Sequence, residues 1–448
     1  MDTVMKARYK TIVDELAQAI RSGGLAAGTQ LPTHRRLAAE RRVSLATATR
    51  VYQELEAMRL VSGEAGRGTF VRDLTLPAGL GIDQDAVGAS MLDLNFNSPM
   101  LDDQGELLRQ ALRQVATSGD IAALLRYQPH GGRAAEREQI ANDLRRRRLN
   151  VGPDNVLIVS GAQHGLCVAM MAMLRPGDAV AVDALTYPGF KVLATQLHLE
   201  LLPLPVTADG PCPDALHALC RTRHIRALYA MPTLHNPLGW VLSASRRDAL
   251  VAVARAHDLL IIEDAAYAFL ADSPPPPLAA LAPERTLYVT GYSKNIATGL
   301  RVGAVAAPDA CLPALERAIR ATAWNTPALL SGIVCGWIAD GTLARLEEEK
   351  RADGRRRQQL VREMLHPLKP IGHPNAYYSW LPLGEEIRAE AVIRRLRDNG
   401  VSLSTAEPFC TTGSPPHALR LALGSVTLAQ LRDALRKIAA GIEYCRYL

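Results

Sequence analysis

The sequence predicts a multidomain protein in which a small helical domain ending in a β-hairpin precedes a larger α/β domain with a smaller α+β lobe. Its 448 residues are too many for one small core. Helical periodicity fills residues 1–72, whereas short apolar strands alternate with helices over residues 91–448. Residues 73–90 are rich in glycine, alanine and aspartate and lack periodicity, so we interpret them as a linker.

The first domain is predicted to contain three helices and a hairpin. Residues 7–22 repeat apolar side chains at helical spacing. Thr33 can cap a short second helix, and a third helix spans Ser44–Met58, with Ser44 as its cap. Two β-prone segments joined by a glycine-rich turn follow, at residues 60–62 and 69–72. This order is that of three helices followed by a wing.

The positive charge of the chain is concentrated in this first domain. Residues 1–72 carry 12 lysines and arginines against 7 aspartates and glutamates, whereas the other 376 residues are nearly neutral, with 39 basic and 38 acidic side chains. An excess of positive charge on one small domain predicts a polyanionic partner for that domain.

The helical pattern places candidate DNA-contacting side chains on the third helix. In a helix-turn-helix the second of the two helices enters the major groove. The amino-terminal half of the third helix carries Thr47, Thr49 and Arg50, whose hydroxyl and guanidinium groups suit base edges and phosphates. Arg35, on the preceding helix, would face the DNA backbone. The glycine-rich hairpin tip could enter a minor groove.

This whole segment resembles the GntR family of winged-helix regulators. The matched residues are Gly24-Leu25-x-x-Gly28-x-x-Leu31-Pro32-x-x-Arg35-x-Leu37-Ala38, Val43-Ser44-x-x-Thr47-x-x-Arg50-x-Tyr52-x-x-Leu55 and Gly66-Arg67-Gly68-Thr69-Phe70-Val71. The resemblance implies a winged helix-turn-helix that binds double-stranded DNA through Arg35, Thr47, Arg50 and Gly68. The family often has an arginine directly after the Val-Ser pair, where this chain has Leu45, so the operator sequence stays open. The alternative is a winged helix used only for protein contacts.

The large domain is predicted to hold a largely parallel sheet, because helices alternate with its strands. The predicted strands are residues 156–160, 179–182, 227–230, 259–263, 286–290 and 303–306. The last hundred or so residues mix helices with two further strands, at 378–381 and 418–423, and are predicted to form the smaller lobe. The proline run 274–277 is interpreted as a stiff surface loop.

A lysine and an acid in the large domain suit pyridoxal 5'-phosphate (PLP). Lys294 follows a predicted strand, and a lysine buried there can lose its proton and attack an aldehyde. Ser293 and Arg301 could hold the phosphate. Asp264, which follows the apolar run Ile261-Ile262-Glu263, could pair with a protonated pyridine nitrogen. Its alternative is the role of a helix N-cap.

Further residues complete the set of groups that PLP needs. The turn from Val159 to Gly165 runs from strand to helix, where free N–H groups form a phosphate site. Tyr187 could stack on the ring. Asn236 and Tyr267 could contact the phenolic oxygen. Arg420 could bind a substrate carboxylate with both arms of its guanidinium group.

These elements together resemble the fold-type I, class I aminotransferases, over about residues 91–448. The resemblance implies that PLP forms a Schiff base with Lys294 and that Asp264 is the partner of the pyridine nitrogen. The remaining cofactor contacts that it implies are Tyr187, Asn236, Tyr267, Ala162, Gln163, Ser293 and Arg301. Tyr127 matches a tyrosine that reaches the phosphate of a neighbouring subunit, and Arg420 matches the carboxylate arginine. The alternative is that these are ordinary core and surface residues.

Two departures from the aminotransferase pattern stand out. The family usually has Ser or Thr three residues before the lysine, where this chain has Gly291. It often has Pro before the Gly-Leu-Arg sequence, where this chain has Thr298. The first departure removes a phosphate hydroxyl, so we expect weaker cofactor binding, which would suit a sensor.

The fusion of the two domains resembles the MocR subfamily of GntR regulators. The resemblance implies a homodimer that binds PLP as an effector or as a receptor for an amine. The leading hypothesis is a DNA-binding transcription regulator that senses PLP, or an amine or amino acid, through an aldimine at Lys294. The alternatives are a working class I aminotransferase with an accessory DNA-binding domain, and a scaffold that binds PLP only for stability.

Several other classes of protein are disfavoured by the sequence. No apolar run approaches the roughly 18 residues that would span a bilayer, and the first residues lack an apolar signal region. We therefore expect a cytoplasmic protein without membrane contact. The seven cysteines are scattered and form no Cys-x-x-Cys motif, so neither disulfides nor a metal site is expected.

Overall fold

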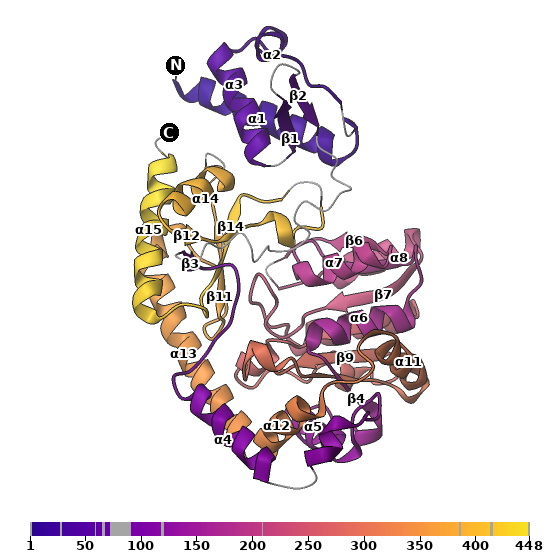
Figure 1. The fold of residues 1–448 in the computed structure, drawn as a ribbon. Helices are drawn as coiled ribbons and strands as arrows, with labels where there is room; N and C mark the ends of the chain where they lie inside the picture. The colour runs from indigo at the N-terminus through magenta and orange to yellow at the C-terminus, as the bar shows by residue number, and fades with distance from the viewer. Residues whose placement is uncertain are drawn as a thin grey trace.

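The computed structural model describes residues 2–26, 29–58, 60–64, 68–71, 91–117, 121–207, 209–384, 387–412 and 415–446. The predicted linker, residues 73–90, lies outside the described residues. Figure 1 shows the first domain above a small lobe that contains the carboxyl terminus, with a large lobe beside and below that lobe.

The first domain has the predicted three helices and hairpin. Its elements are α1 (Asp2–Arg21), α2 (His34–Arg41), α3 (Leu45–Ala57), β1 (Val61–Glu64) and β2 (Gly68–Val71). Both predicted caps form: the Thr33 hydroxyl accepts the Arg36 amide, and the Ser44 hydroxyl accepts the Thr47 amide. Apolar side chains from all three helices and both strands pack into one core, so this domain has a core of its own.

The large lobe contains a mixed sheet in the order β4-β10-β9-β8-β7-β5-β6. The strands are β4 (Val156–Val159), β5 (Ala179–Asp183), β6 (Glu200–Leu204), β7 (Ile225–Ala230), β8 (Leu260–Asp264), β9 (Thr286–Gly291) and β10 (Gly303–Ala306). The six strands predicted for this sheet are confirmed within two residues at each end. The sheet is parallel except for β10, which pairs antiparallel with both β4 and β9. Strand β6 was not predicted, because Pro203 interrupts its pattern; the strand lies at the edge of the sheet, where a proline is tolerated.

Helices cover both faces of this sheet. They are α4 (Gln104–Thr117), α5 (Ala134–Arg146), α6 (Ala162–Met173), α7 (Pro188–Gln196), α8 (Pro213–Thr222), α9 (Ala244–Ala256), α10 (Leu278–Leu281), α11 (Leu312–Thr322) and α12 (Ala328–Ala339). Successive residues of β8 point to opposite faces: Ile262 packs with α6 and α7, and Ile261 packs with α8 and α9. This two-sided burial explains why the strands are continuous apolar runs.

The small lobe is formed by residues from both ends of the aminotransferase-like part of the chain. Its elements are β3 (Leu92–Asp93), β11 (Tyr378–Pro382), α14 (Ala389–Asp398), β12 (Val401–Ser402), β13 (Ser404–Thr405), β14 (Ala418–Ala422) and α15 (Leu428–Arg446). Three antiparallel strands lie in the order β11-β14-β13, and β12 pairs in parallel with β3. The lobe therefore includes residues just after the predicted linker, and not only the last hundred residues as expected from the sequence.

The long helix α13 (Thr342–Leu365) connects the two lobes. Its first half contributes Leu343 and Leu346 to a core of the large lobe. Its second half contributes Leu360, Val361 and Leu365 to the core of the small lobe. Figure 1 shows the helix running between the lobes, so a relative movement of the lobes must act on its middle.

The first domain docks on the small lobe through charged side chains. Arg388, only 3% exposed, donates to both carboxylate oxygens of Asp14 on α1, at 2.5 and 3.0 Å, and to the Lys10 carbonyl oxygen at 2.8 Å. Arg21, at the end of α1, lies 3.7 Å from the carboxylate of Glu407. Beside these pairs, residues of α1 and of the small lobe line a cavity of about 160 Å³.

Membrane and metal features are sparse in the described part of the chain. No single described helix is long and apolar enough to cross a membrane, although α12 and α13, bent by 81° at their junction, meet the length and composition criteria when joined. The described residues contain no group of three side chains that could hold a metal ion. All seven cysteines are free thiols in the structure.

Candidate cofactor pocket and DNA-binding surface

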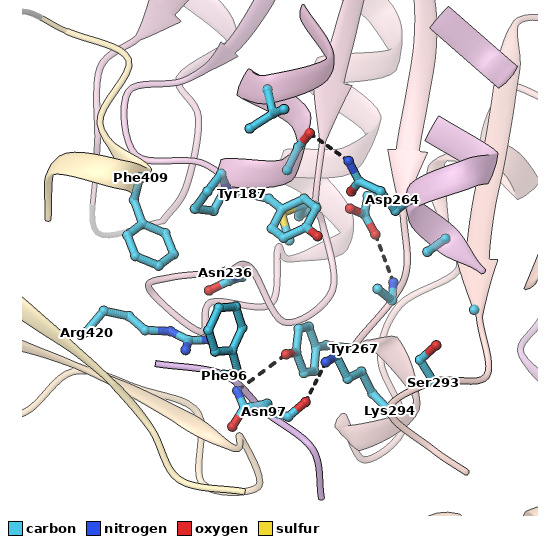
Figure 2. A pocket seen from close by; sticks show the side chains of 18 of the residues that line it. Phe96, Asn97, Tyr187, Asn236, Asp264, Tyr267, Ser293, Lys294, Phe409 and Arg420 are labelled. Carbon is cyan, nitrogen blue, oxygen red and sulfur yellow. Dashed lines mark hydrogen bonds between the residues drawn. The ribbon is translucent and has the colours of Figure 1, made fainter. Parts of the chain in front are cut away.

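The main candidate site is a cavity of about 340 Å³ between the two lobes. It lies at the carboxyl ends of parallel strands, including β8, and at the start of α6, which is where open α/β sheets bind ligands. Figure 2 shows side chains from both lobes pointing into it. The lining includes ten of the predicted cofactor and carboxylate residues: Ala162, Gln163, Tyr187, Asn236, Asp264, Tyr267, Ser293, Lys294, Arg301 and Arg420.

Asp264 forms the acidic end of the cavity. It ends β8 and is 3% exposed, so burial raises the pKa of its carboxyl group. The Ala266 amide and the Tyr229 hydroxyl donate to its two oxygens at 3.0 and 2.8 Å, which partly offsets the effect of burial. These bonds hold the carboxylate where a protonated ring nitrogen could meet it, although the N-cap-like bond to Ala266 also fits the alternative role of this residue.

Lys294 lies on the opposite side of the pocket, in the loop after β9. Its ammonium group donates to the carbonyl oxygen of Asn97 at 2.5 Å. The side-chain nitrogen Nδ2 of Asn97 in turn donates to the Tyr267 hydroxyl at 3.4 Å. Figure 2 shows Lys294, Asn97 and Tyr267 as one connected group. The Lys294 side chain is therefore held at the cavity by a neutral carbonyl oxygen, which accepts a hydrogen bond but does not take up the proton of the lysine.

The start of α6 and Arg301 form an anion-binding corner. Gly161 precedes the helix without a side-chain cap, so the first N–H groups of α6 are free to bind an anion. The Arg301 guanidinium donates to the Ser293 hydroxyl at 3.2 Å and to the Ser160 carbonyl oxygen at 3.3 Å. Burial, together with the charge of Arg301, lowers the pKa of nearby His164.

The backbone is tightly packed at this corner. A Cβ atom on Gly161 would lie 2.8 Å from Arg301 Nη2, and one on Gly291 would lie 2.9 Å from the Ala162 amide nitrogen. Such contacts are closer than real Cβ atoms allow. The departure at Gly291 therefore has a local reason, because in this chain the end of β9 packs directly on the start of α6.

Arg420 closes the cavity from the small lobe. It lies on β14, is 3% exposed, and donates to the Asn95 carbonyl oxygen at 2.8 Å. Its guanidinium carbon lies 5.6 Å from the ring centre of Phe409 and 5.2 Å from that of Tyr378. Burial lowers the pKa of Arg420. A buried cation without a carboxylate partner among the described residues suits a ligand carboxylate.

Three polar atoms that line the cavity fit a polar ligand. Gln163 Oε1, Asn236 Oδ1 and Arg420 Nε are buried without a hydrogen-bond partner within the described part of the chain. Each such atom costs about 1–3 kcal/mol if it stays unpaired. Together with the basic corner, the buried acid and the amine, they form the donor set that PLP and an attached amino acid require.

Sequence reasoning missed several residues of this site. Phe96 and Asn97 line the cavity from the segment after β3, and Phe409 lines it from the small lobe. Tyr229 is the hydroxyl partner of Asp264. The position of Tyr229 on a predicted strand, residues 227–230, was a usable signal for that residue. Nothing in the local pattern of the others indicated a site.

Tyr127 is not part of the cavity within one chain. Its side chain is 85% exposed and its ring lies 5.5 Å from that of Trp324. Other exposed apolar side chains, including Ile121 and Leu125, are close to it in sequence. Its predicted role, contact with the phosphate of a neighbouring subunit, stays a prediction.

The predicted DNA-contacting residues divide into two groups. Arg35 and Gly68 are exposed, and Thr47 lies at the exposed start of α3. Thr49 is turned away: its hydroxyl bonds to His34 of α2 at 3.2 Å, because it lies about 200° around the helix from Thr47. The Arg50 guanidinium lies 4.4 Å from the ring centre of Tyr9 on α1. In this arrangement Thr49 and Arg50 face other helices of their own domain.

Comparisons with known families match both parts of the chain. The model of class I and II aminotransferases matches residues 89–438, and the model of the bacterial regulatory proteins of the GntR family matches residues 8–71. Class I and II aminotransferases depend on PLP, which confirms the predicted cofactor. The GntR domain implies DNA binding.

Individual relatives agree with the family models. The chain is 27% identical to the uncharacterized HTH-type transcriptional regulator YdeF of Bacillus subtilis, over 97% of this chain and 94% of that protein. It is 29% identical to the HTH-type pyridoxine biosynthesis transcriptional regulator PdxR of Corynebacterium glutamicum, over 80% and 78% of the two chains.

Among solved structures, an archaeal alanine:glyoxylate aminotransferase superposes with a TM-score of 0.74 at 24% identity, over 80% of this chain and 92% of that one, which shows the fold. The chain therefore belongs to the class I and II aminotransferase family and carries an amino-terminal DNA-binding domain of the GntR family, the combination found in the MocR subfamily of transcription regulators.

Proposed function

We propose that this chain is a transcription regulator whose affinity for DNA depends on PLP held at Lys294, or on an amine or amino acid that takes the place of Lys294 on the cofactor. One observation carries the proposal. Residues 405–410 of the small lobe line the cofactor cavity at one end and contact the DNA-binding domain at the other.

The two contacts of this segment are only two residues apart. Phe409 lines the cavity beside Arg420. Glu407 pairs with Arg21 of α1 and, like Thr405, lines the cavity between the domains. A ligand that moves Phe409 would therefore act on the docking of the DNA-binding domain. It can do so only if it binds the two arrangements with different affinities.

In this proposal each part of PLP has a partner among the residues that line the cavity. Asp264 would hold the ring nitrogen, Tyr187 would stack on the ring, and Asn236 and Tyr267 would hold the phenolic oxygen. The phosphate would bind at the start of α6, with Ser293 and Arg301. Bound PLP supplies an aldehyde and an electron-withdrawing ring. Arg420 would bind the carboxylate of an amino-acid effector.

The test of the proposal is a titration of the protein on its own upstream DNA at fixed salt, with and without PLP. Salt must be fixed because phosphate contacts make the affinity for DNA steeply salt-dependent. Sequence-specific binding that changes with PLP would support the proposal, and binding that changes only after an amine is added would point to the amine as effector. No preference over random DNA would contradict the proposal for that promoter.

Arg35→Ala is expected to weaken DNA binding by a similar factor on all sequences and to lower the slope of log affinity against log salt by about 1. The reason is the loss of one exposed cation at the phosphate backbone. Affinities measured at several salt concentrations check this. Thr49→Ala is the control, because Thr49 bonds to His34 within the domain and its loss should leave the salt slope unchanged.

Asp14→Ala is expected to release the DNA-binding domain from the small lobe. Without the carboxylate, the buried Arg388 guanidinium keeps only the Lys10 carbonyl oxygen. Because the Asp14 side chain is 56% exposed, the loss should be smaller than the roughly 3–5 kcal/mol that breaking a fully buried pair costs. Amide hydrogen exchange should rise in α14, while PLP binding stays unchanged. Glu15→Ala is the matched control, because Glu15 pairs with Arg41 inside the DNA-binding domain. Equal exchange in both variants would show that the pair does not hold the domains together.

The assembly is proposed to be a homodimer in the cytoplasm. Exposed apolar side chains near Tyr127, such as Leu125 and Trp324, would be covered by a second copy of the chain. A regulator of transcription must reside with the chromosome, which in bacteria is the cytoplasm.

The second candidate function is transamination, and the arrangement of Lys294, Asp264 and Arg420 in one cavity favours it. An amine, a buried acid and a carboxylate-binding cation are the groups that the reaction uses. Incubation with an amino acid and 2-oxoglutarate tests it. Turnover at the rates typical of metabolic enzymes, about 1–1000 per second, would favour an enzyme over a regulator.

A further inference from the structure

Lys350 is a second lysine close to Lys294, and it was not expected to have a role. It lies in the middle of α13 and its side chain is fully buried, with 0% exposure. Its ammonium group donates to three backbone carbonyl oxygens: that of Pro99 at 2.8 Å, that of Lys294 at 3.2 Å, and that of Ile296. No carboxylate is among its hydrogen-bond partners within the described residues.

These carbonyls belong to the two segments that present the Lys294 amine. Residues 292–297, here called the lysine loop, carry Lys294. Residues 95–99, here called the strap, carry the Asn97 carbonyl oxygen that accepts the Lys294 side chain. Neither segment is a helix or a strand, so their relative position depends on contacts such as those of Lys350.

A second contact from α13 reaches the lysine loop one turn earlier. Glu347 Oε1 accepts the side-chain amide of Asn295 at 2.8 Å. The Tyr377 hydroxyl of the small lobe donates to the Lys350 carbonyl oxygen at 3.0 Å. The helix therefore holds the loop at two points, in the part of α13 that lies between its large-lobe and small-lobe halves.

We propose that Lys350 is a positioning residue for Lys294. The buried ammonium group of Lys350 joins the lysine loop to the strap and so holds the Lys294 amine in position to react with an aldehyde. The proposal rests on the proposed function, in which Lys294 captures PLP. Because α13 spans both lobes, the same contact makes the reactivity of Lys294 sensitive to the position of the small lobe.

The charge of Lys350 gives the proposal a pH signature. Burial, and the positive charge of Lys294, lower the pKa of Lys350 to about 7, while Asp353 and Glu347 on the same helix oppose the shift. The described residues of the strap that face it are uncharged. Lys350 is therefore charged below about pH 7 and loses its charge as the pH rises through that value.

The experiment measures how fast the full-length protein captures PLP across neutral pH, followed by absorbance and by borohydride trapping with peptide mass spectrometry. Lys350→Met should capture PLP at Lys294 about 10-fold more slowly, because the charge-assisted bonds are lost. Lys350→Arg keeps its charge at every pH. The ratio of the wild-type rate to the Lys350→Arg rate should therefore fall as the pH passes about 7.

Arg351→Met is the matched control for damage to α13. Arg351 follows Lys350 on this helix and also donates to a backbone carbonyl oxygen, that of Phe269 at 2.8 Å, and it lies 3.8 Å from the Asp272 carboxylate; neither partner belongs to the lysine loop or the strap. Its capture rate should keep the wild-type pH profile even if its stability falls.

The capture rates separate the positioning role of Lys350 from the proposed capture of PLP by Lys294. A wild-type capture rate and pH profile in Lys350→Met would overturn the positioning role. If Lys350→Met does not fold, a flat ratio of wild type to Lys350→Arg would overturn it instead. Failure of the wild-type protein to trap PLP at Lys294 would contradict the proposed function, which is a separate result from failure of the Lys350 variants alone.

Discussion

Replacing Lys294 with alanine is expected to abolish covalent capture of PLP and every change in DNA affinity that depends on it. Lys294 is the one lysine that lines the cavity among the described residues, and the nearby Lys350 is outside that lining. The affinity for DNA without ligand should stay within a few-fold of wild type, because Lys294 lies in the large lobe, away from the docked domain. Absorbance of the lysine-linked cofactor and DNA titrations with and without PLP measure both effects.

Lys294→Arg is the control for the loss of charge at this position. Arginine keeps a cation that can donate to the Asn97 carbonyl oxygen, but it does not attack an aldehyde. The two variants should therefore behave alike in the DNA titrations. If DNA binding by both variants still changed with ligand, the effector would act without Lys294. That result would contradict the proposal that the ligand is sensed through a covalent bond to Lys294.

Arg301→Gln is expected to weaken PLP binding by about 100-fold, or about 2.7 kcal/mol. Arg301 is the cation of the phosphate corner, and hydrogen bonds to charged groups are worth about 1.5–3 kcal/mol each. Equilibrium titration with PLP measures the loss. Because the arginine acts on the phosphate, pyridoxal without the phosphate should bind wild type and variant with similar, weak affinities.

Arg148→Gln controls for the unusual backbone at this position. Arg301 and Arg148 both have positive φ, 48° and 65°, so both substitutions act on a left-handed residue. Arg148 donates to the Pro274 carbonyl oxygen, away from the cofactor cavity. If the two variants bound PLP equally well, Arg301 would have no specific role, and the phosphate would have to bind elsewhere in the cavity.

The sequence predicted the large-lobe side of the pocket because its signals are local. Ser293, Lys294 and Arg301 lie within nine residues, and Asp264 ends an apolar run. In a parallel sheet the carboxyl ends of strands meet at one edge, so residues just after separate strands come together by topology alone. Those residues were therefore predictable one strand at a time, and the cavity does gather them.

Side-chain direction within the DNA-binding domain was harder to predict. Thr47, Thr49 and Arg50 are neighbours in sequence, but helical geometry spreads them around α3. Which of them faces solvent depends on how α1 and α2 pack against that helix. His34 engages Thr49, and the Tyr9 ring lies against Arg50. The residue types alone do not specify that packing.

By itself, the sequence determined the two families, the cofactor, and six of the seven strands of the large sheet, because each depends on local motifs or on periodic burial. Only the tertiary structure decided that Lys350 supports the lysine loop and that Arg388 holds Asp14. Lys350 lies 56 residues from Lys294, and Arg388 lies 374 residues from Asp14. Such pairs leave no pattern in the sequence, because the acceptor is often a backbone carbonyl that every residue has, and the fold alone brings the partners together.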